Sequence, residues 1–499
     1  MRLRTLSLLA LGVVFLASCG GGGGSGGAGS SAFTVPGRIV SDRFRECLEA
    51  QAALKGWRRN SDVRSIECVR DYRVTAYGTG VENLEGVQVF FNLEEIIIYS
   101  SGSYGLGQID DLSPLKGLKR LHTIEMYTSA LTDFESIRGK PSLRRLVVVP
   151  SRVNDLSALP SLPNLKHLNI SGATIHARPI DDYSPLAQLS GLEELHLQAH
   201  YTLSQYGLSF LNGMQNLRLL NLAENFLRTA DEIRSLPALE VLDLSYNNLF
   251  SDFDDTAVEN MLGGLSSLKE FYYARFDGHS LEFLGGMTAL EVLVITRYFS
   301  LSLADTTVIG SLTNLRELYL GGFVNADTSP LQGLSNLEIL WLANGTVDSS
   351  TLAFPETMSS LRELHMLDAF SYTYNYGDRN GYFKSTYAVF EDLPALQTLN
   401  LDRPWLLDES GVTLNPNVRD LAMVEARLDS LEFLRDVPGI ISLDLSDNPF
   451  TELDPLATMP DLIELTLNDT TVSCAEMDEF RTAAPEVSVV TDLYCPSSR

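Results

Sequence analysis

The sequence predicts an α/β fold built as a curved array of parallel β-strands, with about sixteen repeats and a cap at each end that is held by a disulfide bond. Three observations predict it. A short pattern with apolar residues at its first, fourth and sixth positions occurs sixteen times, starting at Leu93 and ending with the copy that starts at Leu462. Eight of the fifteen spacings between copies are 22 residues. Four cysteines stand in two pairs, one pair near each end of the array.

Each copy of the pattern predicts one short β-strand. In segments such as NLEEIIIYS and NLRELYLGG, the apolar fourth and sixth positions alternate with positions that face the opposite way, which is the period of a strand. Spacers such as DLSPLKGL and DLSALPSL contain Asp, Ser and Pro, which favour turns and helix starts. Such short strands are not stable alone, so the copies must stack and bury one continuous ladder of leucines.

The 22-residue unit with its DLSPL spacer resembles the internalin-like leucine-rich repeats of bacterial surface proteins. This resemblance covers nearly all of the chain after its N-terminal segment. It implies a leucine-rich repeat solenoid that binds a partner on its concave, strand-bearing face. One departure is that the asparagine expected at the ninth position occurs only as Asn225, Asn247 and Asn448. In the other repeats, the buried backbone must therefore find different hydrogen-bond partners.

The N-terminal segment predicts export and a lipid anchor. Two arginines precede an apolar run at residues 6–17, a signal-peptide arrangement that is too short to span a bilayer. The following residues LASC, at 16–19, resemble the lipobox of bacterial lipoproteins, which implies cleavage after residue 18 and lipidation of Cys19. Gly20 implies, by the same resemblance, the outer membrane of a Gram-negative bacterium. An ordinary secretory cleavage site with an unrelated cysteine is the alternative.

These features divide the chain into five parts. They are a signal peptide at 1–18, the lipidated cysteine with a flexible Gly/Ser-rich tether at 19–32, an N-terminal cap at 33–84, the repeats at 85–470 and a C-terminal cap at 471–499. Both caps are expected to hold a helix, within SDRFRECLEAQAALKGW and CAEMDEFRTAAPEVSVV, and the second helix is followed by an edge strand.

Geometry limits how the four remaining cysteines pair. Sixteen strands about 4.8 Å apart make an arc on the order of 75 Å long, so no disulfide can join the two ends. This leaves the pairs Cys47–Cys68 and Cys474–Cys495, each closing one cap in an oxidising compartment. Metal binding by these thiols is the alternative, but no histidines accompany them.

Composition and motifs argue against several functions. The formal net charge of −27 repels phosphate backbones and lipid headgroups, so we expect no nucleic-acid partner and membrane contact only through the lipid. The sequence contains no metalloprotease, nucleophile-elbow or phosphate-loop motif. We therefore expect no enzymatic activity, no cofactor and no metal. Asp252, Asp254 and Asp255 could bind calcium, although a solvated loop explains them better.

The candidate ligand site lies where repeats eight to twelve carry bulky residues at their fifth positions. These positions should project from the concave face as an exposed ladder, a composition typical of binding hot spots. The fifth-position residues are Tyr272, Val294, Tyr319, Trp341 and His365, and the third positions add Glu270, Glu317 and Glu363. A Tyr-rich insertion that contains Tyr374 and Tyr376 follows them. In both places, packing of the aromatic side chains on one another is the alternative to ligand binding.

The sequence thus predicts a membrane-anchored, monomeric surface protein that binds another macromolecule, expected to be a protein, through its concave face. Binding of a glycan or of peptidoglycan is the first alternative, because tyrosine and tryptophan faces also stack on sugars. A purely structural role in the envelope is the second. Periplasmic and external orientations both remain open.

Overall fold

The structure is a computed structural model that describes most of the chain from residue 33 onward. The described residues are 33–68, 81, 83–99, 109–127, 130–149, 152–172, 179–249, 260–275, 281–301, 307–323, 329–343, 358–367, 393–403, 414–435 and 437–495. Cys19, the three aspartates near residue 254, and Tyr374 and Tyr376 lie outside them. The chain divides into two compact units, Met1–Leu249 and Phe250–Arg499.

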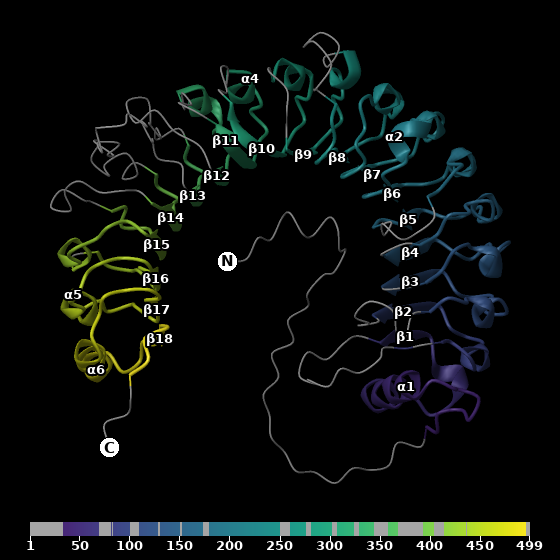
Figure 1. Ribbon diagram of the computed structural model, residues 1–499, viewed down its shortest axis with the longest axis horizontal. Coiled ribbons are helices and arrows are strands. Elements are labelled where there is room, and N and C mark those ends of the chain that lie inside the picture. The colour runs from purple at the N-terminus through teal and green to yellow at the C-terminus, as the bar shows by residue number, and fades with distance from the viewer. Residues whose placement is uncertain are drawn as a thin grey trace. The chain divides into compact units, whose positions relative to one another are not determined.

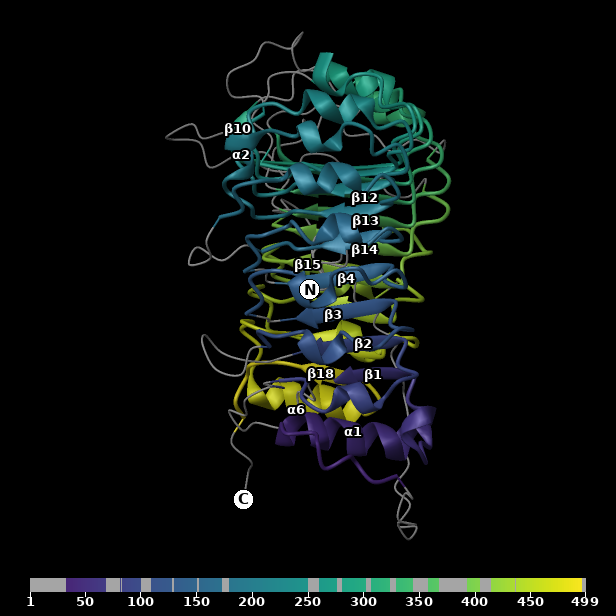
Figure 2. The ribbon, with the colours of Figure 1, turned by 90° about the vertical axis from the view of Figure 1, so that its right-hand side faces the viewer.

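The described part of the first unit contains eight strands that pair in parallel, each with the next along the chain. Figure 1 shows these strands on the inner side of the unit, and Figure 2 shows them stacked as successive rungs. They are β1 (Ser65–Cys68), β2 (Glu95–Tyr99), β3 (Thr123–Tyr127), β4 (Arg145–Val149), β5 (His167–Asn169), β6 (Glu194–His196), β7 (Leu219–Asn221) and β8 (Val241–Asp243).

Ten strands with the same sequential parallel pairing lie in the described residues of the second unit. They are β9 (Glu270–Ala274), β10 (Val292–Leu301), β11 (Glu317–Phe323), β12 (Ile339–Ala343), β13 (Glu363–Leu367), β14 (Thr398–Asp402), β15 (Asp420–Val424), β16 (Ser442–Asp444), β17 (Glu464–Thr466) and β18 (Ser488–Val490). The sixteen predicted repeat strands are β2 to β17, and β1 and β18 belong to the two caps. The predicted repeat fold is confirmed.

The core is the ladder that the sequence pattern predicts. Side chains at the first, fourth and sixth positions of all sixteen repeats are at most 3% exposed. Because parallel register places equal positions of neighbouring repeats side by side, these side chains stack into buried columns within each unit. Each inner strand of a unit is thus held by its two neighbours.

Short helical turns lie on the outer side of each unit (Figure 1). In several spacers an aspartate starts the turn: Asp111 Oδ1 accepts a hydrogen bond from Ser113 N at 2.7 Å, and Asp182 Oδ1 accepts one from Ser184 N at 2.8 Å. Hydrogen bonding by the serine hydroxyl, and after it by the serine N–H, lowers the pKa of both carboxyls. The 3-10 turns are Asn60–Asp62, Val87–Val89, Ser113–Leu115, Glu135–Ile137, Leu159–Ser161, Ser184–Gln188, Ser209–Leu211, Asp231–Ser235, Glu282–Gly286, Ser329–Gly333 and Glu432–Leu434.

The α-helices are α1 (Asp42–Lys55), α2 (Leu203–Tyr206), α4 (Thr307–Gly310), α5 (Asp454–Ala457) and α6 (Cys474–Ala483). Among the described residues, no helix has both the length and the apolar character needed to cross a membrane.

The two caps form as predicted. The helix α1 starts after Ser41, whose Oγ accepts a hydrogen bond from Phe44 N, and α6 starts after Ser473, whose Oγ accepts one from Glu476 N. The Cys47–Cys68 disulfide joins α1 to β1 with its Cα atoms 5.7 Å apart, and Cys474–Cys495 joins α6 to the segment after β18 with its Cα atoms 5.6 Å apart. Both predicted disulfides are confirmed.

Buried side chains at the ninth position of several repeats bond the backbone of the preceding repeat. Asn225 Nδ2 donates to Leu197 O at 2.8 Å, and Asn247 Nδ2 donates to Leu222 O at 2.9 Å. His200 occupies the same position and is 2% exposed, and its Nε2 lies 2.8 Å from Ile170 O. A neutral imidazole with its proton on Nε2 therefore donates the bond that asparagine donates elsewhere.

Candidate functional site

The five predicted fifth-position residues lie on adjacent strands of the second unit. The strand register pairs Tyr272 with Val294, Val294 with Tyr319, Tyr319 with Trp341, and Trp341 with His365. They belong to β9, β10, β11, β12 and β13, and they point away from the leucine ladder because side chains alternate along a strand. The register therefore forms the predicted column.

The burial of two members corrects the prediction of a fully exposed ladder. Tyr272 is 5% exposed and Val294 is 1% exposed, so neither side chain presents a surface to a partner. Tyr319, Trp341 and His365 are partly exposed. We call these three residues the aromatic cluster, and it is the accessible part of the column.

The rings of the aromatic cluster contact one another. The Trp341 and His365 rings are stacked, with centroids 4.4 Å apart and planes at 21°. The Tyr319 and Trp341 centroids are 6.0 Å apart at 34°. Contacts between aromatic rings contribute about 0.5–1.5 kcal/mol per pair beyond the burial of apolar area. The cluster is therefore a preformed surface, and binding on it requires little ordering of side chains.

The glutamates at the third positions hold the tyrosines. Tyr272 Oη donates to Glu270 Oε2 at 2.8 Å, and Tyr319 Oη donates to Glu317 Oε2 at 3.0 Å. Residues two apart on a strand share a face, so each glutamate lies beside the ring that it holds. Glu363 lies beside His365, with its Oε2 3.8 Å from His365 Nε2. All three predicted glutamates thus adjoin members of the column.

Burial lowers the pKa of His365 to about 4. The imidazole is therefore neutral near pH 7 and adds no positive charge to the aromatic cluster. Its Nδ1 is buried and has no hydrogen-bond partner among the residues that the structure describes. Trp341 thus stacks on a neutral ring.

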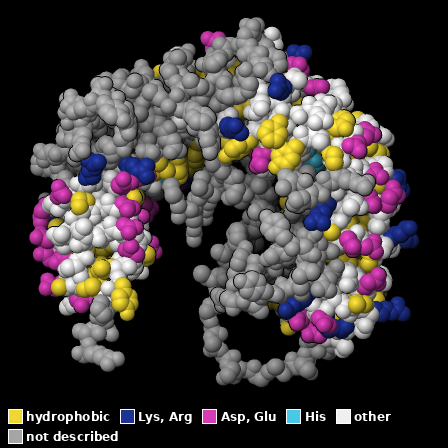
Figure 3. Space-filling view, viewed as in Figure 1, with side chains coloured by type: hydrophobic (Ala, Val, Ile, Leu, Met, Phe, Trp, Pro, Cys, Tyr) yellow, Lys and Arg dark blue, Asp and Glu magenta, His cyan; other side chains and the backbone are white. Residues whose placement is uncertain are grey.

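The strand face around the aromatic cluster is acidic. The third, fifth and seventh positions of β9 to β17 face the same side, and they include neither lysine nor arginine. Figure 3 shows acidic side chains gathered over the described C-terminal repeats. The carboxylates at these positions are Glu270, Glu317, Glu363, Asp402, Asp420, Asp444 and Glu464.

The strand face of the first unit carries one arginine and a histidine that lie beside carboxylates of the same face. Arg145 Nε donates to Glu125 Oε1 at 2.6 Å, and His167 Nδ1 lies 2.8 Å from Glu194 Oε2. The bond with His167 lowers the pKa of Glu194. The third, fifth and seventh positions of β2 to β8 hold four carboxylates and one arginine, so this face is also acidic, with fewer carboxylates than the face of the second unit.

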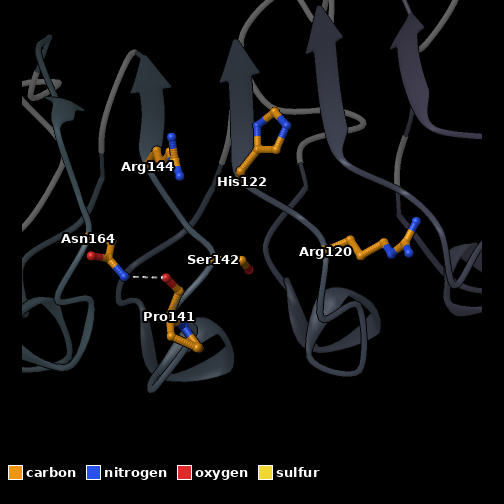
Figure 4. Close-up of a pocket in the computed structure, with 6 residues that line it drawn as sticks. All are labelled: Arg120, His122, Pro141, Ser142, Arg144 and Asn164. Atoms are coloured by element: carbon orange, nitrogen blue, oxygen red, sulfur yellow. Dashed lines mark hydrogen bonds between the residues drawn. The ribbon is translucent and has the colours of Figure 1, made fainter.

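A pocket of about 390 Å³ lies on one flank of the first unit, away from the strand face. Figure 4 shows its six lining residues, which come from the loops and strand starts of adjacent repeats. They are Arg120, His122, Pro141, Ser142, Arg144 and Asn164. Within the described residues, no group of three or more His, Cys, Asp or Glu side chains is arranged to hold a metal ion.

Comparison with known proteins gives one family match and similar solved structures. Residues 215–271 match the family model described as Leucine Rich repeats (2 copies). The chain is a leucine-rich repeat solenoid. It is similar to an internalin of Listeria monocytogenes, with 20% identity, coverage of 81% of this chain and 87% of that chain, and a TM-score of 0.41. It is also similar to a leucine-rich repeat protein of Leptospira interrogans, with 18% identity, coverage of 88% and 98%, and a TM-score of 0.49.

A search of curated proteins gave no match. Leucine-rich repeat solenoids present extended strand faces that serve as binding surfaces. In this solenoid, sequence reasoning missed the flank pocket and the role of His200. Both could have been found by comparing equal positions of successive repeats. His200, for example, stands where Asn225 and Asn247 stand in the next two repeats.

Proposed function

We propose that the protein is a lipid-anchored binding scaffold that recognises a basic surface of a partner protein through the strand face of the second unit. The observation that carries this proposal is the aromatic cluster, which is partly exposed and surrounded by carboxylates. Partly buried tyrosine and tryptophan side chains are the commonest binding hot spots. Lysine and arginine side chains suit this surface because they bind carboxylates and also pack on aromatic faces.

A double substitution tests the proposal. Tyr319→Ala with Trp341→Ala should weaken capture of the partner by at least about a hundredfold, because each hot-spot truncation costs about 2 kcal/mol. The measurement is affinity capture from envelope extracts with the wild-type and variant proteins, compared partner by partner.

The matched control is Tyr206→Ala with Tyr494→Ala, which removes two tyrosines that are 46% and 86% exposed and lie outside the strand face. It should leave capture unchanged. A partner that binds the double variant and the wild type equally would refute the aromatic cluster as its site.

Glycan binding is the second candidate function, since the stacked Trp341 and His365 rings also suit the face of a sugar. Titration of the purified protein with peptidoglycan fragments separates the two. Saturable binding of a fragment, together with no captured protein, would replace the protein-partner proposal. If neither ligand binds saturably, a structural role in the envelope would replace both.

The lipid anchor at Cys19 completes the proposal and rests on the sequence of residues 1–32. A Gly/Ser-rich tether at this place would hold the binding face near the membrane, which would raise its effective concentration for partners there. Cys19→Ser should move the protein from the membrane fraction to the soluble fraction. Immunoblots of the two fractions measure this change. Retention of this variant in the outer membrane would contradict the anchor.

A further inference from the structure

Three large aromatic side chains are exposed where strands β6, β7 and β8 of the first unit end. Tyr201 is 41% exposed, and Phe226 and Tyr246 are each 46% exposed. Tyr201 and Phe226 occupy the tenth positions of successive repeats, and Tyr246 occupies the eighth position of the next repeat. Figure 3 shows hydrophobic side chains at the surface over this part of the unit. Packing in the leucine ladder does not explain rings that are exposed to this extent.

The local backbone does not explain them either. Phe226 has a φ of 54° and Tyr246 has a φ of 57°, and both values lie in the left-handed region. Glycine and asparagine adopt this conformation at less cost than a residue with a bulky side chain. Gly172 and Asp447 occupy the eighth position in other repeats, with φ values of 78° and 61°. The presence of aromatic residues at such positions therefore indicates a role for their rings.

Two of these rings adjoin one another. The Tyr201 and Phe226 ring centroids are 5.5 Å apart, with the ring planes at 36°. Since the two residues belong to neighbouring repeats, their rings make an apolar platform that follows the edge of the sheet from one repeat to the next.

A polar pair adjoins the platform. Gln198 Nε2 donates to Glu224 Oε1 at 2.8 Å, and both side chains are partly exposed. Glu224 stands two residues before Phe226, and its N donates to the carbonyl of Ser245, the residue before Tyr246, at 2.8 Å. The pair keeps one amide N–H and one carboxylate oxygen for a ligand. We call these five residues the edge patch: Gln198, Tyr201, Glu224, Phe226 and Tyr246.

We propose that the edge patch binds a neutral polysaccharide chain. The C–H face of a sugar ring packs on an aromatic ring, and the hydroxyls at its rim both donate and accept hydrogen bonds. An apolar partner would instead bury the Gln198–Glu224 pair without replacing its water, which is unfavourable. A cationic partner gains less here than on the strand face of the second unit, because the carboxylate of Glu224 already accepts the bond from Gln198.

The charge of the protein favours a neutral chain over an anionic one. The net charge of −27 opposes the approach of polyanions, and anionic polysaccharides are among them. The edge patch lies in the first unit and does not depend on the proposed function of the second.

Neutral linear hexasaccharides of glucose, N-acetylglucosamine, xylose and mannose are the probes, used with the full-length protein. Isothermal titration should show saturable binding of at least one of them to the wild type. Tyr201→Ala with Phe226→Asn should weaken this binding at least about tenfold, because both rings of the platform are lost. Asparagine is chosen at position 226 because it tolerates the left-handed backbone. The affinity should not change between about 0.05 and 0.5 M salt, because the ligand carries no charge.

Two controls locate the site. Phe91→Ala with Tyr494→Ala removes aromatic side chains that are 60% and 86% exposed, one before β2 and one after β18, and should leave the affinity unchanged. Tyr319→Ala with Trp341→Ala removes the aromatic cluster of the second unit and should also bind the hexasaccharide as the wild type does. This variant separates the edge patch from the proposed function, because loss of a protein partner in it would leave sugar binding intact.

Several results would overturn the proposal: no saturable binding of any hexasaccharide, equal binding by the edge-patch variant, or equal weakening by either control. Binding of an oligolysine peptide that depends on Tyr201 and Phe226, without binding of any hexasaccharide, would replace the polysaccharide with a basic partner. Circular dichroism checks that each variant is folded. If the edge-patch variant unfolds, the single Tyr201→Ala variant replaces it, and unchanged affinity in that variant would refute the site.

Discussion

Asn247→Ala should destabilise the first unit by about 4 kcal/mol. Asn247 is 1% exposed, and its Nδ2 donates to Leu222 O and Leu244 O, both at 2.9 Å. Its Oδ1 accepts hydrogen bonds from Asn225 N and Leu227 N. Alanine would remove these bonds from Leu244 O, Asn225 N and Leu227 N, at about 1–3 kcal/mol for each group that water cannot reach. Leu222 O would still accept a hydrogen bond from Asn225 Nδ2 at 2.8 Å.

Denaturant unfolding followed by circular dichroism measures this loss, and Asn216→Ala is the matched control. Asn216 is exposed and donates a single bond, from Nδ2 to Ser190 O at 3.0 Å. Its removal should cost about 1 kcal/mol or less. Equal destabilisation by the two substitutions would show that the buried asparagines do not hold the repeats together.

Acidification from about pH 6.5 to pH 4 should remove about 3 kcal/mol of stability through His200 alone. Burial lowers the pKa of His200 to about 4, whereas an imidazole in the unfolded chain titrates near 6.5. The unfolded state therefore binds a proton first as the pH falls. Stability is complete above about pH 6.5 and is lost as the pH falls toward 4, at about 1.4 kcal/mol for each unit of pH.

His200→Asn isolates this contribution. Asparagine does not titrate, and at this position it can donate to Ile170 O as Asn225 donates to Leu197 O. The variant should match the wild type near pH 7 to within about 1 kcal/mol and lose less stability on acidification. His196 and His365, whose pKa values burial also lowers to about 4, should still produce acid lability in the variant. An unchanged pH profile would contradict the role of His200.

Much of the fold could be predicted because it depends on local periodicity. The alternation of buried and outward positions determines each strand, and the repeat length determines which strands become neighbours. The pairing of the cysteines could be predicted because residues at opposite ends of a long array cannot meet. None of these inferences requires knowledge of how particular side chains pack.

The candidate site was less predictable because exposure depends on tertiary packing. Alternation indicates that Tyr272 and Val294 point away from the leucine ladder, but it does not show whether other parts of the chain cover them. The flank pocket needs residues from adjacent repeats to be brought together, so the chain read in order does not reveal it. Its only signal in the sequence is that the second positions of three successive repeats are all basic, namely His122, Arg144 and Lys166.

The dissociation constant of the captured partner most directly tests the claim that the second unit binds through its strand face. It should be measured for the wild type, for Tyr319→Ala with Trp341→Ala, and for Tyr206→Ala with Tyr494→Ala, at low and high salt. We expect a loss of at least about a hundredfold in the first variant only, and association that slows as salt screens the acidic face. Equal affinity of all three proteins would contradict the claim.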